Sequence, residues 1–393
     1  MIASFDVTSR LSHLVREMAP SGIRRFFDLV STMESVISLG VGEPDFVTPW
    51  GIRNACVNAL EEGYTSYTSN SGRLSLREAI ADYLEDRFAL RYQPQSEILV
   101  TVGASEAIDL ALRAILNPGD EVLIVEPCYI SYAPCVRLAG GIPVSVPTRA
   151  ENGFKPTEEE LSRRITPRTK AIMLCFPNNP TGAALHRSEM EVIARVAIQH
   201  DLLAIADEIY AELTYQGSPA SLAAIPGMQE RTILISGFSK AFAMTGWRIG
   251  YACAHPDIIA LMVKIHQYTM LCAPVMAQIA AEQALRHNLS EMQEMVTSYR
   301  QRRNLFVKGL NEIGLTCHLP EGAFYAFPSI QSTGLRSEEF AERLLFEAHV
   351  AVVPGTAFGP EGEGYIRCSY ATSIAHIEEA LTRMARFVEE RRK

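Results

Sequence analysis

The stretch Leu202-Leu203-Ala204-Ile205-Ala206-Asp207 decides the fold class, because an apolar run of strand length ends there at an acidic residue. Apolar runs of similar length occur at residues 98–102, 121–125, 170–175, 232–236 and 248–254, and segments with helical periodicity separate most of them. This alternation predicts an α/β fold with a mostly parallel sheet and helices on both faces. Ligands bind such folds at the carboxyl ends of the strands, where Asp207 lies.

The character of the chain changes after about residue 287. Charged segments with helical periodicity cover residues 290–311 and 337–348, and short apolar runs lie near 323–327, 351–354 and 365–369. This mixture is typical of a smaller α+β domain. We therefore predict a large domain at residues 40–287 and a small domain made of residues 1–39 and 288–393.

Composition narrows the functional classes. Of the 393 residues, 48% are hydrophobic and 21% are charged, as in soluble globular proteins. The net charge is -9 and the basic residues are scattered, so we expect neither nucleic acid nor membrane as a partner. The eight cysteines form no CxxC pair and the nine histidines form no HExxH pattern. We therefore expect free thiols, no metal site and a cytoplasmic location.

Lys240 lies in the run Ser236-Gly237-Phe238-Ser239-Lys240-Ala241-Phe242-Ala243-Met244-Thr245-Gly246-Trp247-Arg248. A free lysine amine has a pKa of ~10.4 and is a poor nucleophile at neutral pH. A nearby cation such as Arg248 disfavours the ammonium form and therefore activates the amine. This combination suits a cofactor that carries both an aldehyde and a phosphate, namely pyridoxal phosphate.

A candidate phosphate site follows the apolar run at residues 98–102. Gly103-Ala104-Ser105 opens a segment with helical periodicity, so the first turn offers free backbone N–H groups to an anion. Arg248 adds a planar positive group. A nicotinamide site is the competing interpretation, but the segment at residues 40–45 lacks the third glycine of that motif and runs into a proline.

Asp207 and Tyr210 suit the ring of such a cofactor. Asp207 ends a buried strand, where a carboxylate needs a cationic partner, and a protonated pyridine nitrogen is one. Tyr210 is placed to hydrogen-bond the ring oxygen. Taken alone, Asp207 could equally cap a helix and Tyr210 could simply be packed.

Two further residues suit the substrate. Asn179 lies in Phe176-Pro177-Asn178-Asn179-Pro180-Thr181-Gly182, where it can donate to an oxyanion and where we expect a cis bond to Pro180. Arg367 lies within an apolar run, where its guanidinium can hold an α-carboxylate through two hydrogen bonds. An ordinary turn and a surface salt bridge are the structural alternatives.

These residues together resemble the fold-type I aminotransferases, specifically the aspartate aminotransferase family and its broad-specificity prokaryotic branch with alanine and aromatic enzymes. The resemblance covers nearly the whole chain and implies a seven-stranded sheet. It rests on the order of the motifs at residues 20–24, 40–46, 103–107, 178–182, 207–210, 240–248 and 322–325, and on Arg367.

The resemblance implies a pyridoxal phosphate cofactor and a role for each site residue. Lys240 would carry the internal aldimine and shuttle the Cα proton, and Asp207 would pair with the pyridinium nitrogen. Tyr210 and Asn179 would contact the ring hydroxyl, and Arg248 would hold the phosphate. The remaining cofactor contacts are expected from Gly103, Ala104, Ser105, Tyr129 and Ser239.

The resemblance also implies substrate contacts and an assembly. Gly42, Asn179 and Arg367 would bind the substrate carboxylate. Tyr67 falls where such enzymes send a tyrosine to the phosphate of the neighbouring subunit, which implies a homodimer with shared active sites.

Two positions depart from the family pattern. Gly237 stands where some relatives have a phosphate-binding serine, which leaves Ser236 or Ser239 as candidates. Ser105 stands where some aspartate-specific relatives have a lysine, which argues against strict specificity for aspartate.

The predicted activity is therefore transfer of an amino group from an L-amino acid to a 2-oxo acid, with glutamate and 2-oxoglutarate as one pair. A carbon–sulfur β-lyase on the same fold is the alternative enzyme. A cofactor-binding regulator fused to a DNA-binding module is a third hypothesis, but nothing before residue 40 is long or basic enough for a winged helix. The preferred donor stays open between aromatic, alanine and aspartate, with Ser21, Ile23 and the loop near Tyr64 as further pocket candidates.

Overall fold

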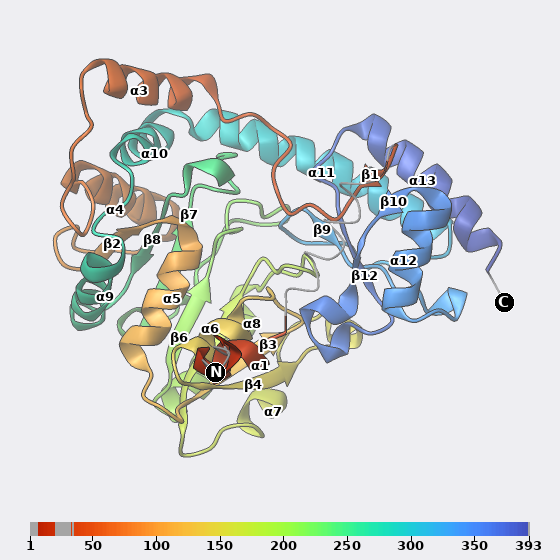
Figure 1. Ribbon diagram of the computed structural model, residues 1–393, viewed down its shortest axis with the longest axis horizontal. Helices are drawn as coiled ribbons and strands as arrows, with labels where there is room; N and C mark the ends of the chain where they lie inside the picture. Colours follow the sequence, from red (N-terminus) through yellow and green to blue (C-terminus); the bar gives the residue numbers. More distant parts are fainter. Residues whose placement is uncertain (1–6, 20–32, 34, 392–393) are drawn as a thin grey trace, which may run out of the picture.

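A seven-stranded sheet forms the centre of the larger part of the chain (Figure 1). The computed structural model describes residues 7–19, 33 and 35–391. The strands run in the order β2-β8-β7-β6-β5-β3-β4, and all neighbouring pairs are parallel except those of β8. Their bounds are Ile98–Thr101, Glu121–Glu126, Ile142–Pro147, Thr169–Cys175, Leu203–Asp207, Thr232–Gly237 and Gly250–Cys253 for β2 to β8. The predicted α/β fold with a mostly parallel seven-stranded sheet is confirmed.

Helices cover both faces of this sheet because its central strands are apolar on both sides. On β3, Val122 and Ile124 pack in the core that contains α5, whereas Leu123 and Val125 pack in the core that contains α8. The helices of this part are α3 (Trp50–Glu61), α4 (Leu74–Phe88), α5 (Gly103–Ile115), α6 (Tyr132–Leu138), α7 (Glu158–Ser162), α8 (Arg187–Gln199), α9 (Pro256–Thr269) and α10 (Val275–His287).

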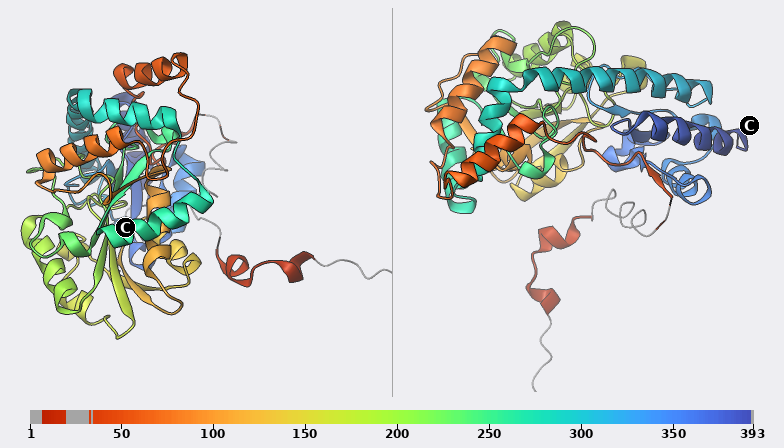
Figure 2. Two further views of the ribbon diagram at one scale, coloured as in Figure 1. Left: turned by 90° about the vertical axis from the view of Figure 1, so that its left-hand side faces the viewer. Right: turned by 90° about the horizontal axis from the view of Figure 1, so that it is seen from above.

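The C-terminal part contains short strands and long helices, as the sequence predicts. Its strands β9 (Tyr325–Ala326), β11 (Val353–Pro354) and β12 (Ile366–Ser369) form an antiparallel sheet. Its helices are α12 (Ser337–Ala348) and α13 (Ile374–Glu389), and the long α11 (Leu289–Glu312) extends from the larger part into this one (Figure 2). The exact division into domains stays a prediction.

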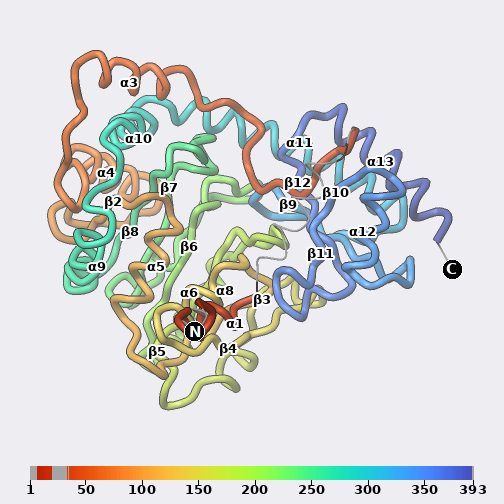
Figure 3. The backbone as a smooth tube through the Cα atoms, viewed as in Figure 1, coloured from red at the N-terminus to blue at the C-terminus, as the bar shows by residue number. Residues whose placement is uncertain are grey.

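The N-terminal segment joins the C-terminal part through β1 (Ile37–Ser38), which pairs in parallel with β10 (Val350–Ala351). From there the backbone runs along the molecule to α3 (Figure 3). Helix α1 (His13–Glu17) contains no buried residue. The predicted contacts of Ser21 and Ile23 lie outside the described residues. Among the residues that the structure describes, no helix has both the length and the apolarity needed to cross a bilayer.

Two differences from the sequence prediction have local causes. Strand β4 escaped detection because it is a partly exposed edge strand that contains two prolines, Pro143 and Pro147. Strand β8 begins at Gly250 and not at residue 248, because Arg248 has a left-handed backbone conformation with φ of 52°.

Candidate active site

A cleft of about 780 Å³ lies at the carboxyl ends of β5, β6 and β7, beside the N-terminus of α5. This is where ligands bind in folds of this class. The cleft brings together most of the predicted site residues, namely Gly42, Ala104, Ser105, Tyr129, Asn179, Asp207, Tyr210, Ser239, Lys240, Arg248 and Arg367.

Lys240 follows β7 and extends into this cleft, where its Nζ donates a hydrogen bond of 2.8 Å to the carbonyl of Gly42. Burial is the main cause that lowers the pKa of Lys240 to about 8; Glu43 opposes the shift, and Arg367 and Arg248 add to it. The sequence-based argument named the cation and missed the larger effect of burial. A lysine with this pKa has a larger uncharged fraction near neutral pH than a free lysine and can act as a nucleophile.

Asp207 ends β6 and is almost completely buried, at 4% exposure. Its Oδ2 accepts a hydrogen bond of 2.6 Å from the hydroxyl of Tyr132, and its Oδ1 accepts one of 3.2 Å from the backbone of Ile209. Burial raises the pKa of Asp207, which the bond from Tyr132 opposes. Among the described residues no ion pair involves Asp207, so a cationic group of a ligand would relieve its desolvation.

The N-terminus of α5 and Arg248 form the end of the cleft that suits an anion. Gly103 has φ of +75°, and a Cβ at this position would lie 2.5 Å from Nη2 of Arg248, so only glycine allows this approach. A Cβ at Gly250 would lie 2.6 Å from the backbone nitrogen of Ala104. Because Val102 at the N-cap offers no side-chain cap, the N–H groups of the first turn can serve a ligand.

The structure separates the two serines that the sequence left as candidates near Lys240. Ser239 lines the cleft, whereas the hydroxyl of Ser236 donates a bond of 3.3 Å to the carbonyl of Glu208. Gly237, where some relatives have serine, packs so closely on β8 that a Cβ would lie 2.9 Å from Cα of Gly250. The strand packing therefore accounts for this departure from the family pattern.

Arg367 of β12 lies at the other end of the cleft. Its Nη1 donates a bond of 3.0 Å to Oδ1 of Asn179 and its Nη2 donates one of 2.6 Å to the carbonyl of Gly40. The guanidinium lies between the rings of Tyr325 and Phe358, at 4.6 and 4.9 Å from their centroids. Burial lowers its pKa, and its Nε has no hydrogen-bond partner among the described residues.

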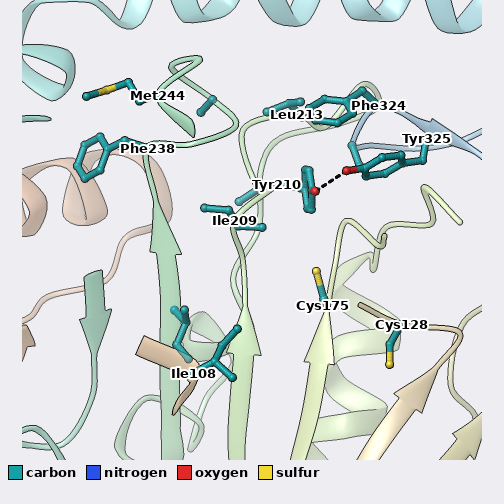
Figure 4. Packing of buried hydrophobic residues seen from close by; sticks show 14 of the residues in the cluster. Ile108, Cys128, Cys175, Ile209, Tyr210, Leu213, Phe238, Met244, Phe324 and Tyr325 are labelled. Carbon is teal, nitrogen blue, oxygen red and sulfur yellow. Dashed lines mark hydrogen bonds between the residues drawn. The ribbon is translucent and has the colours of Figure 1, made fainter. Parts of the chain in front are cut away.

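Asn179 follows β5 and Tyr210 follows β6, and both residues line the cleft. The Asn179–Pro180 bond is cis, as predicted. The side-chain oxygen of Asn179 is used by Arg367, so its Nδ2 is the group that can donate to a ligand. The hydroxyls of Tyr210 and Tyr325 lie 2.8 Å apart and point toward each other (Figure 4).

Tyr67, which the resemblance assigns to the phosphate of a neighbouring subunit, does not line the cleft of its own chain. Tyr67 is 82% exposed and, together with Tyr64, lines a separate surface hollow of about 490 Å³. Conversely, sequence reasoning gave no role to Tyr132 and Tyr325. Tyr132 is far from Asp207 in the sequence, and no local pattern links the two.

This chain is similar to known proteins over almost its whole length. The family model described as "Aminotransferase class I and II" matches residues 34–384. The YugH protein of Bacillus subtilis is 60% identical over 97% of this chain and 99% of its own length. An aspartate aminotransferase of Pyrococcus abyssi is 48% identical over 95% of this chain and 97% of its own. The solved structure of an aromatic aminotransferase from Pyrococcus horikoshii superposes with a TM-score of 0.90 at 46% identity, covering 94% of this chain and 99% of that one.

Proposed function

Because this chain belongs to the class I and II aminotransferases, which depend on pyridoxal phosphate, we propose that it moves an amino group from an L-amino acid to a 2-oxo acid, with glutamate and 2-oxoglutarate as one pair. One observation carries the proposal. A single cleft holds an amine of lowered pKa, a buried carboxylate and two guanidinium groups, on Lys240, Asp207, Arg248 and Arg367.

Three features of the cleft fit this cofactor. The uncapped first turn of α5 and Arg248 suit its phosphate. The buried Asp207, which has no ion-pair partner among the described residues, suits a protonated ring nitrogen. When bound, the cofactor supplies an aldehyde that condenses with amines and a ring that accepts the electrons left by a departing Cα proton.

The side chains divide the work along the cleft. Lys240 Nζ would attach the cofactor and, after the substrate amine displaces it, take the Cα proton as general base. Arg367 and Gly42 would fix the substrate carboxylate, with Arg367 Nε as a donor that the chain itself leaves unused. Tyr210 and Asn179 Nδ2 would donate to the ring oxygen, and Ser239 would join Arg248 at the phosphate.

A homodimer with shared sites is part of the proposal. Arg248 is exposed, so the phosphate end is open in a single chain, and Tyr67 is exposed on another surface. Large apolar side chains are exposed on α3 and at the end of α9, including Trp50, Leu60, Tyr268 and Met270. A second copy would cover such side chains and bring its Tyr67 to the phosphate. The cytoplasmic location stays a prediction, for which the eight free thiols are the support.

Borohydride reduction of the holoenzyme, followed by peptide mapping, tests the attachment site. We expect the label on Lys240, and a label on another residue or on none would contradict the proposal. L-Glutamate added to the unreduced enzyme should bleach the cofactor's visible absorbance and release one equivalent of 2-oxoglutarate per site. A carbon–sulfur lyase would instead release ammonia from a sulfur-containing amino acid.

The variant Lys240→Ala should lower kcat by about 10⁴-fold or more, because attachment and general base are lost together. Circular dichroism and thermal unfolding should show an intact fold, since within the described residues the Lys240 amine makes one hydrogen bond, to the carbonyl of Gly42. Turnover near that of the parent enzyme would exclude Lys240 as the catalytic lysine.

A further inference from the structure

A buried side-chain pair lies directly behind the anion-binding turn. Glu106, in the first turn of α5, places its Oε1 2.6 Å from Nδ1 of His266 on α9. Its Oε2 accepts a bond of 2.6 Å from the backbone N–H of Val102, the N-cap residue. The side chain of His266 is fully buried and that of Glu106 is 9% exposed.

The bond between Glu106 and Val102 stabilises a helix N-terminus that has no side-chain cap. Helices are commonly capped by a side chain at the N-cap, which uses an N–H group of the first turn. Val102 cannot do this, so the first-turn N–H groups stay available, but the turn loses the bond that usually fixes it. Glu106 supplies a bond from within the helix to the N-cap residue, and this bond uses none of the N–H groups of Ala104 and Ser105.

The position of Glu106 carries an electrostatic cost for an anion site. A carboxylate near this turn opposes the negative charge of a phosphate, although it is favourable for the helix itself. The hydrogen bonds of Glu106 to Val102 and His266 therefore explain why a glutamate occupies this position. His266 fixes the carboxylate from behind, so that Oε2 points at Val102.

The C-terminal end of helix α9 contacts both Glu106 and the segment that carries Tyr67. The backbone carbonyl of His266 accepts bonds from Met270 and Leu271, and the carbonyl of Leu271 accepts one of 2.7 Å from Nδ2 of Asn70. The helix end at His266 therefore contacts both the anion-binding turn and the loop at Asn70.

We propose that Glu106 and His266 are positioning residues that hold the turn at residues 102–105 in the shape that binds the cofactor's phosphate. The inference rests on the proposed function. Neither side chain lines the cleft that would hold the cofactor. The pair sets affinity for the phosphate and leaves affinity for the rest of the cofactor unchanged.

The test compares pyridoxal phosphate with pyridoxal, which lacks the phosphate, on full-length protein stripped of its cofactor. Absorbance titration gives a Kd for each. Glu106→Leu should weaken binding of pyridoxal phosphate on the order of tenfold and leave binding of pyridoxal unchanged. Glu106→Gln keeps the bond from the Val102 N–H through its amide oxygen, and its amide nitrogen can donate to Nδ1 of His266 when the proton of the neutral ring is on Nε2. It should bind pyridoxal phosphate as well as the parent protein or better, because a negative charge is removed.

His266→Leu should show the same selective loss, and His266→Asn, which can still donate from a position close to Nδ1, should restore most of the affinity. This second pair decides the matter if Glu106→Leu does not fold. Asp109→Leu removes an acidic residue of α5 that pairs with Arg113 on the helix surface and serves as the matched control without effect.

Equal losses for both ligands, no loss for either, or failure of the conservative variants to restore affinity would each overturn this role. A parent protein that binds no pyridoxal phosphate would overturn the proposed function, and this role with it. The two failures are therefore distinguishable.

Discussion

The two ends of the cleft differ in how completely one chain builds them. Arg367 is 3% exposed, is held by Asn179 and the carbonyl of Gly40, and lies between two aromatic rings. Arg248 is exposed and bonds only the carbonyl of Thr245 among the described residues. The first end is held by packing within one chain, whereas the second has fewer contacts among the described residues and, on the proposed function, would be completed by the cofactor and a second subunit.

The strongest test of this difference is Arg367→Gln. It should raise KM for amino acids about 10²-fold, because two charge-assisted hydrogen bonds to the carboxylate are lost, while the Kd for pyridoxal phosphate stays unchanged. Steady-state kinetics and cofactor titration measure the two effects. Arg367→Lys should remain impaired, since a lysine keeps the charge and loses the planar fork. A parallel loss of cofactor affinity would show that the two ends are not independent.

The opposite pattern is expected at the other end. Arg248→Gln should weaken binding of pyridoxal phosphate about 30-fold, through loss of a charged partner of the phosphate, and should change binding of pyridoxal far less. KM for amino acids, measured at saturating cofactor, should stay within a few-fold of the parent value. If KM rose as much as in Arg367→Gln, the division of labour between the two ends would be wrong.

Both arginines, one at each end of the cleft, lower the pKa of Lys240. Its free amine has a pKa of about 8, so the rate at which the cofactor-free enzyme binds pyridoxal phosphate should rise with pH, with a midpoint near pH 8. Each arginine destabilises the ammonium form, so removing either one favours that form and moves the midpoint to higher pH. Stopped-flow absorbance over a pH series measures the midpoint. A midpoint near 10 in the parent enzyme would contradict the lowered pKa.

Tyr67→Phe should produce the smallest effect, a loss in pyridoxal phosphate affinity of about fivefold from one hydrogen bond to an anion. The loss should appear only where dimers are present, because Tyr67 lies outside the cleft of its own chain. Cofactor titration alongside sedimentation analysis tests this. A monomeric enzyme with full activity would show that one chain completes the phosphate end without a partner.

Much of the fold could be predicted from local patterns. The apolar runs gave β2, β3, β5, β6 and β7 within one or two residues, because these strands are largely buried on both faces and are therefore apolar on both. Edge strand β4, which is partly exposed, lacked that signal. The family resemblance, carried by the order of motifs around Lys240, is confirmed. The roles of individual site residues stay predictions.

The sequence by itself determined the fold class, the family and the chemical groups at the strand ends, because these depend on periodicity and on the order of motifs along one chain. Only the tertiary structure decided which groups meet. In the folded chain the hydroxyl of Tyr132 donates to Asp207, and His266 lies within hydrogen-bond distance of Glu106. Ser239 lines the cleft and Ser236 does not. Such contacts join segments far apart in the sequence, and their geometry follows from how the helices and strands pack.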